Sequence, residues 1–192
     1  MKIINFRFVL IVFGVFLFSC NQNNSKIDSE TYLEFQNKGT NISNLSQATL
    51  LANVAKAMQK GGSEYAVEFC NLKVSSIVDS LNIANDCVIS RVSAKNRNPE
   101  NGLKGNQEKE LWALFQNNQL GDTLVRTKQN LVYYKPIKIG MPACLKCHGN
   151  PETEINSATS EKLQTLYPHD LATGYKLKDF RGLWKIEFET NP

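Results

Sequence analysis

The chain of 192 residues is 42% hydrophobic and 21% charged, and its formal net charge is +4 at pH 7. Its length fits one ordinary domain that is large enough to bury a core without disulfides. The small net charge gives no reason to expect nucleic acid as a partner, and five cysteines are too few for a disulfide scaffold.

The N-terminus has the pattern of a bacterial signal peptide. Lys2 and Arg7 form a short basic region, and residues 8–18 form an apolar run that is too short to span a bilayer as a stable helix. The run ends at Leu17-Phe18-Ser19-Cys20, which resembles a lipobox with a bulky Phe18. We expect residues 1–19 to be cleaved and Cys20 to be lipidated. The alternative is an uncleaved membrane anchor.

This N-terminus predicts an exported, membrane-anchored lipoprotein that faces the periplasm or the cell exterior, with the membrane as a partner through its lipid. Residues 21–38 are polar and rich in Asn, Ser and Gln. We therefore expect residues 20–40 to form a lipid-anchored flexible tether and residues 41–192 to form one folded domain.

Two helices are expected at the start of the domain. Apolar residues from about Ile42 recur at helical spacing, and Gly61-Gly62 ends that helix. Ser63 is a suitable N-cap for a second helix from Glu64 to about Leu81.

The remainder favours strands, with shorter helices between them. We expect strands over residues 87–93, 123–127, 131–139 and 182–190, a helix over 108–115, and a short helix that Ser160 caps. Helices early and strands later predict an α+β domain with an antiparallel sheet.

The most informative segment is Cys144-Leu145-Lys146-Cys147-His148. Cys-x-x-Cys-His is the attachment signature of a c-type haem. Each thiol can add to one vinyl group on the porphyrin edge, and the histidine that follows coordinates the iron from below the ring. The export signal agrees, because covalent haem attachment in bacteria takes place outside the cytoplasmic membrane. We therefore expect one covalent haem, bound through Cys144, Cys147 and His148.

Two other chemistries use a Cys-x-x-Cys pair. A closed zinc site takes four ligands, and outside the motif only Cys70, Cys87 and His169 remain, scattered singly. A thioredoxin-like dithiol lies at the start of a helix in a βαβ unit, whereas Gly149 follows this motif at once.

Several phrases along the chain resemble those of one family, in the family order over roughly residues 45–190. It is the c-haem-binding, PAS-like domain of small cyanobacterial haem proteins and of the extracytoplasmic parts of bacterial signalling proteins. The matching phrases are Ala66-Val67-Glu68-Phe69-Cys70, residues 91–101 with Arg97-Asn98-Pro99-Glu100-Asn101, Tyr134-Lys135-Pro136-Ile137, Cys144 to Gly149, Tyr167-Pro168-His169-Asp170, Ala172-Thr173-Gly174-Tyr175 and Arg181-Gly182. The resemblance implies a PAS-like antiparallel sheet with N-terminal helices and a covalently attached haem.

The resemblance also implies an axial pair of the motif histidine and a helix cysteine, which is Cys70 here. Cys70 lies on the apolar stripe of its expected helix, so its sulfur should point into the domain. The alternatives are a buried free thiol and a Cys70–Cys87 disulfide. His169, Met141 and Met58 are weaker ligand candidates. Arg91, Arg97 or Arg181 are candidates to pair with the haem propionates.

Two strong axial ligands leave no open site for substrate, so we do not expect an enzyme. The first expectation is a redox or small-ligand sensor, or a single-electron carrier, that works with an unidentified redox or signalling partner. No kinase, receiver or methyl-accepting segment follows, so a sensor is expected to signal through another protein. The alternative is a peroxidase-type haem enzyme with a labile distal ligand, and a zinc-binding envelope protein is more remote.

Overall fold

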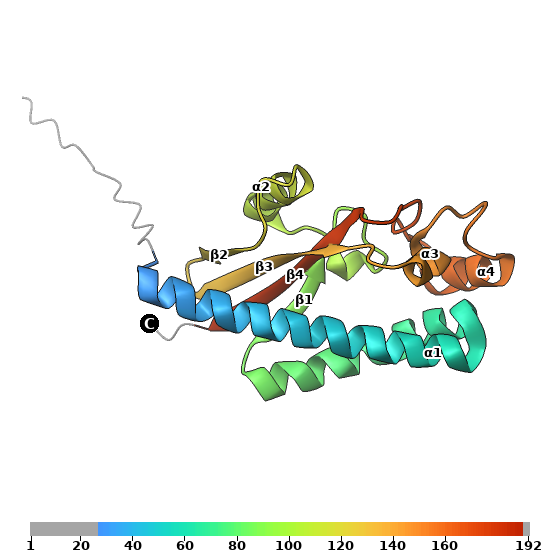
Figure 1. The fold of residues 1–192 in the computed structure, drawn as a ribbon, viewed down its shortest axis with the longest axis horizontal. Coiled ribbons are helices and arrows are strands. Elements are labelled where there is room, and N and C mark those ends of the chain that lie inside the picture. The colour runs from blue at the N-terminus through green and yellow to red at the C-terminus, as the bar shows by residue number, and fades with distance from the viewer. Residues whose placement is uncertain (1–26, 190–192) are drawn as a thin grey trace, which may run out of the picture.

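The computed structural model describes residues 27–189, which form a long helical hairpin packed on a four-stranded antiparallel sheet (Figure 1). The sheet order is β1-β4-β3-β2, so β4 and β3 are the central strands. Helix α2 packs on the opposite face of the sheet, and two short helices lie beyond one end of it. The predicted α+β architecture is confirmed.

Helix α1, Ser29–Asn85, consists of two arms, residues 29–60 and 63–85. Gly61 and Gly62, which lie between the arms, have non-helical backbone angles. Gly62 has φ of 68° and ψ of −164°, a combination that a residue with a side chain rarely adopts. The second arm therefore doubles back alongside the first (Figure 1). The Gly61-Gly62 break was predicted from the sequence.

The strands are β1 (Val88–Val92), β2 (Thr123–Arg126), β3 (Asn130–Lys138) and β4 (Phe180–Glu189). In the antiparallel register, Ile186 of β4 lies between Ile89 of β1 and Tyr133 of β3. All four strands coincide with the predicted ones to within one or two residues. Val132 and Tyr133 point to opposite faces because side chains alternate along a strand.

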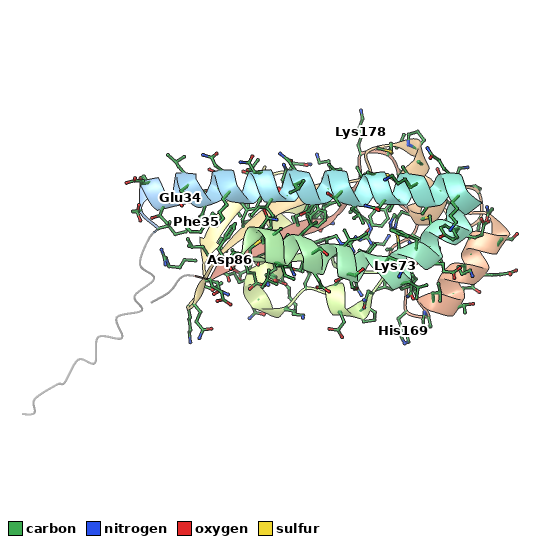
Figure 2. All side chains as sticks on the ribbon, turned by 90° about the horizontal axis from the view of Figure 1, so that it is seen from below. Glu34, Phe35, Lys73, Asp86, His169 and Lys178 are labelled. Carbon is green, nitrogen blue, oxygen red and sulfur yellow. The ribbon has the colours of Figure 1, made fainter. Side chains whose placement is uncertain are left out.

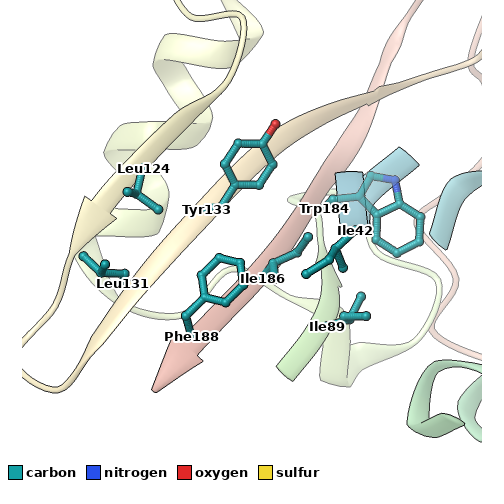
Figure 3. Close-up of a cluster of buried hydrophobic side chains, with 8 residues drawn as sticks. All are labelled: Ile42, Ile89, Leu124, Leu131, Tyr133, Trp184, Ile186 and Phe188. Carbon is teal, nitrogen blue, oxygen red and sulfur yellow. The ribbon is translucent and has the colours of Figure 1, made fainter. Parts of the chain in front are cut away.

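The face toward α1 carries the larger core, drawn in Figure 3. It consists of Ile42, Ile89, Leu124, Leu131, Tyr133, Trp184, Ile186 and Phe188. The Tyr133 hydroxyl donates to Asp122 at 2.8 Å and accepts from the Thr40 hydroxyl at 2.9 Å. Gly39 of α1 lies directly on the Tyr133 ring, where a Cβ would stand 2.6 Å from Cδ1. The helix can approach the sheet this closely because residue 39 is glycine.

The opposite face packs against α2, Gly105–Gln116, which follows the 3₁₀ turn η1, Pro99–Asn101. Its apolar residues are Val92, Leu111, Phe115, Val132, Tyr134 and Leu183. The buried Glu108 carboxylate is paired with the Lys185 ammonium at 2.8 Å and accepts the Lys104 backbone N–H at 2.6 Å. A paired charge of this kind fixes where α2 stands on the sheet.

Helices α3 (Pro142–His148) and α4 (Ser157–Leu166) lie near the Gly61-Gly62 end of α1 (Figure 1). Ser63 and Thr159 have their hydroxyl oxygens 2.6 Å apart in the interior, which joins α4 to the second arm. The expected cap at Ser160 is wrong. Asn156 caps α4 instead, because its side chain accepts the backbone N–H of Thr159 at 2.7 Å.

The expected tether over residues 20–40 is wrong from residue 29 onward. The Asp28 side chain caps α1 by accepting the backbone N–H of Thr31, and residues 29–40 are helical. Tyr32 and Phe35 pack against the sheet core, which stabilises this part of the helix. The predicted signal peptide and Cys20 lie outside the described residues. Among residues 27–189, no helix is both long and apolar enough to cross a bilayer.

We predict that Gly39→Ala destabilises the fold. The added Cβ would overlap the Tyr133 ring, which is fully buried. Overpacking of this kind costs about 1–3 kcal/mol and outweighs the roughly 1 kcal/mol by which alanine favours a helix over glycine. Chemical denaturation should show a lower free energy of unfolding. Gly121→Ala is the matched control, because no atom lies within 4 Å of its added Cβ. Equal stability of both variants would contradict the close approach.

Candidate haem site

A cavity of about 870 Å³ lies between the two arms of α1, the strand β1 and the helix α3. The arms contribute mainly apolar side chains, which include Leu50, Leu51, Val54, Met58, Ala66, Val67, Val74 and Val78. Cys144, Cys147 and His148 line the same cavity, and so does Cys70 of the second arm. The structure thus brings together all four residues for which the sequence predicted a role at the haem.

The local structure of α3 places the motif on one helix face. Cys144 and Cys147 are three residues apart and Cys144 and His148 four, and residues at these spacings are neighbours on a helix surface. Pro142 suits the first turn of the helix, and Gly149 ends it with its N–H bonded to Leu145 O at 2.8 Å. A Cβ at Gly149 would stand 2.6 Å from Leu145 O, so this sharp exit requires glycine.

The His148 ring is held by one hydrogen bond. Its Nδ1 lies 2.7 Å from the backbone oxygen of Ala172, so Nδ1 carries the proton and donates. That tautomer leaves the Nε2 lone pair free for a metal. Burial holds the pKa of His148 well below its usual value of 6.5, and the positive charges of Arg97 and Arg181 lower it further. The imidazole is therefore neutral, which is the form that binds iron.

Arg97 joins the motif to the loop that carries Ala172. Its Nε donates to Asp170 Oδ2 at 2.9 Å, and its Nη2 donates to Cys147 O at 2.5 Å and to Ala172 O at 3.4 Å. The other oxygen of Asp170 accepts the Ala172 N–H at 2.7 Å. This network fixes the acceptor of His148. Of the three arginines considered as propionate partners, Arg97 is already paired with a carboxylate.

Cys70 is contributed by the second arm of α1. Burial raises the pKa of its thiol, and the nearby guanidinium groups of Arg91 and Arg97 act in the opposite direction. Burial also raises the pKa of Cys147 to about 11. The Cys70 thiol raises that pKa by a smaller amount, so the two thiols lie near each other. The predicted position of Cys70 on the inner side of its helix is therefore correct.

The other ligand candidates differ in placement. His169 is exposed and does not line the cavity, and Figure 2 shows it at the molecular surface. Met58 and Met141 both line the cavity, and Met141 is 44% exposed.

The disulfide alternative is wrong, because Cys70 and Cys87 are both free and Cys87 packs against the sheet core. Within residues 27–189, no group of three or more Cys, His, Asp or Glu side chains is arranged to hold a metal ion by itself. The geometry therefore gives the zinc alternative no support. The motif also follows an antiparallel strand rather than lying in a βαβ unit, so nothing here favours a thioredoxin-like dithiol.

Sequence reasoning did not identify two features of the site. The Ala172 acceptor is a backbone oxygen, so residue type gives no signal for it. The second is the Arg97–Asp170 ion pair, which spans 73 residues of sequence. Both residues lie in sequence segments that carry the family resemblance, so each could have been singled out. Their pairing is visible only in the fold.

Comparisons with known proteins agree with this architecture. Among solved structures, the crystal structure of the cyanobacterial haem protein Tll0287 superposes with a TM-score of 0.63 at 21% sequence identity. The match covers 82% of this chain and 96% of that one, and shows a shared fold. No curated protein matches the sequence. The family model described as Tll0287-like matches residues 26–188, almost all of the described chain. The family resemblance is thus confirmed, and the chain belongs to the Tll0287-like family.

Proposed function

We propose that the protein is a c-type haem protein of the bacterial envelope. One haem is held covalently by Cys144 and Cys147, with His148 and Cys70 as the axial ligands of its iron. The observation that supports this proposal is the convergence of these four residues on one cavity of about 870 Å³. Tll0287 is a cyanobacterial haem protein, and this chain's membership of its family supports the same proposal.

The residues around the cavity have distinct roles in this proposal. Cys144 and Cys147 fix the cofactor to α3, and the His148 ring is oriented by Ala172 O so that Nε2 points away from that bond. A bound haem supplies an iron that alternates between the ferric and ferrous states. The apolar walls would exclude water from the ligands, and Cys70, bound as a thiolate, would favour the ferric state by donating charge.

We infer a role in redox or small-ligand sensing or in single-electron transfer. Two protein ligands leave the iron no open position for a substrate, which argues against the peroxidase alternative. Met141, next to Pro142 at the start of α3, is 44% exposed, so the attachment helix reaches the surface. An attachment point at the surface suits exchange of electrons with a partner or entry of a small ligand.

We further propose that the protein is exported and held to the membrane by a lipid on Cys20. The support is the basic and apolar N-terminus that ends in Leu17-Phe18-Ser19-Cys20. Export agrees with a covalent haem, since both require the chain to leave the cytoplasm.

Covalent attachment is tested in cells that carry the c-haem maturation machinery. The purified protein should keep its haem on a denaturing gel and stain for haem peroxidase activity. Cys144→Ala and Cys147→Ala should each weaken the stain, and the double variant should abolish it because no thioether can form. A colourless band from the unaltered protein would overturn the proposal.

The distal ligand is tested by Cys70→Ser, with Cys87→Ser as the matched control because Cys87 is a second partly buried free thiol outside the cavity. Cys70→Ser should change the ferric absorption spectrum and admit cyanide or carbon monoxide, whereas Cys87→Ser should do neither. Cys70→Met should raise the midpoint potential, because a thioether donates less charge than a thiolate. Met58→Leu and His169→Ala should leave the spectrum unchanged. An unaltered spectrum in Cys70→Ser would reduce Cys70 to a packing residue.

The lipid anchor is tested by metabolic labelling with a fatty acid. Label should enter the protein and disappear in Cys20→Ala, which should also be released from the membrane fraction. Equal labelling of both proteins would show that another residue, or an uncleaved apolar segment, holds the chain.

A further inference from the structure

Arg91 of β1 is partly buried and lines the cavity, and its guanidinium group has no anionic partner among the described residues. Among residues 27–189 this group makes no hydrogen bond and no ion pair, and it lies over the Trp184 ring, whose centroid is 5.9 Å from Cζ. A guanidinium group carries five N–H donors. A charge in this position is costly to bury unless an anion and hydrogen-bond acceptors meet it.

Among residues 27–189, the groups that act on the pKa of Arg91 include no carboxylate. Asp79 lines the same cavity but forms no ion pair with Arg91. Burial lowers the pKa of Arg91, and within residues 27–189 the groups that act against this are the Cys70 thiol and the Tyr167 phenol. Neither is anionic at neutral pH, since burial raises the pKa of both. The described part of the chain therefore does not neutralise this cation.

The two neighbouring arginines, Arg97 and Arg181, form side-chain hydrogen bonds that Arg91 lacks. Arg97 has Asp170 and the Cys147 carbonyl as partners. Arg181 donates from Nη1 to Ser93 Oγ and Lys95 O, each at 3.1 Å, but its buried Nε has no partner. Unused donors thus remain on Arg91 and on Nε of Arg181, and both residues line the same cavity.

We propose that Arg91, assisted by Nε of Arg181, forms a carboxylate subsite that takes the propionate groups of the cofactor. This inference rests on the proposed function, because it assigns those carboxylates to a porphyrin bound in the cavity. A haem joined to the protein through its vinyl edge carries both propionates on the opposite edge, so they point away from the two thioethers. Arg91 belongs to β1 and not to α3, so it forms a different wall of the cavity from the one that bears the cysteines.

The test compares two porphyrins that differ only in their carboxylates. Ferric mesoporphyrin IX has ethyl groups in place of vinyls, so it binds reversibly even with Cys144 and Cys147 intact, and its dimethyl ester has no free carboxylate. The full chain is prepared without haem and titrated with each porphyrin, followed by absorbance. The variants are Arg91→Gln, Arg91→Lys and, as a control, Arg126→Gln, which changes an exposed arginine of β2 outside the cavity.

We expect Arg91→Gln to weaken binding of the free acid about tenfold or more, the loss typical of deleting one partner of a charged hydrogen bond. Its affinity for the dimethyl ester should stay unchanged, which also shows that the variant is folded. Arg91→Lys should retain part of the affinity for the acid, and Arg126→Gln all of it.

An equal loss for acid and ester, or no loss for either, would overturn the carboxylate subsite and leave the proposed function intact. If neither porphyrin bound the unaltered chain, the proposed function itself would fail, and the subsite with it.

Discussion

The geometry of the candidate site depends on the ion pair between Arg97 and Asp170. Their side chains are only 14% and 9% exposed, so each charge would be costly to bury without the other. Arg97 also binds the carbonyl of Cys147, and Asp170 also binds the N–H of Ala172, whose carbonyl accepts from His148. Through these bonds one ion pair fixes the motif helix, the loop after α4 and the proximal ring against one another.

The helical hairpin brings Cys70 to a motif that lies more than seventy residues later in the sequence. The Gly61-Gly62 break turns the chain back, and the second arm is then joined to α4 by the buried Ser63–Thr159 contact and by Glu68 with Lys162 at 3.4 Å. The first arm is positioned by its packing on the sheet, where Gly39 meets Tyr133. Contacts at both ends of the hairpin therefore set the distance between the cavity walls.

Much of this architecture could be predicted from local sequence patterns, and the remainder depends on tertiary contacts. The strands follow from β-branched and alternating residues, and the hairpin break follows from two glycines. Residues 29–40 looked like a tether because most of them are polar, yet Tyr32 and Phe35 pack on the sheet once the fold exists. Cys70 was placed on the inner side of its helix correctly. The unpaired state of Arg91 could not be foreseen, because an arginine in a strand carries no sign of what it lacks.

The charges around the cavity favour the protonation states that iron ligands need. Arg91, Arg97 and Arg181 all disfavour the cationic form of His148, and Arg91 and Arg97 favour the thiolate of Cys70 against the effect of burial. Asp170 neutralises only Arg97 by direct contact. The cavity thus has more positive than negative charge on its walls before anything is bound. An occupant that carries carboxylates and binds Cys70 as a thiolate would balance that charge. The arginines and the motif cysteines therefore indicate the same kind of molecule.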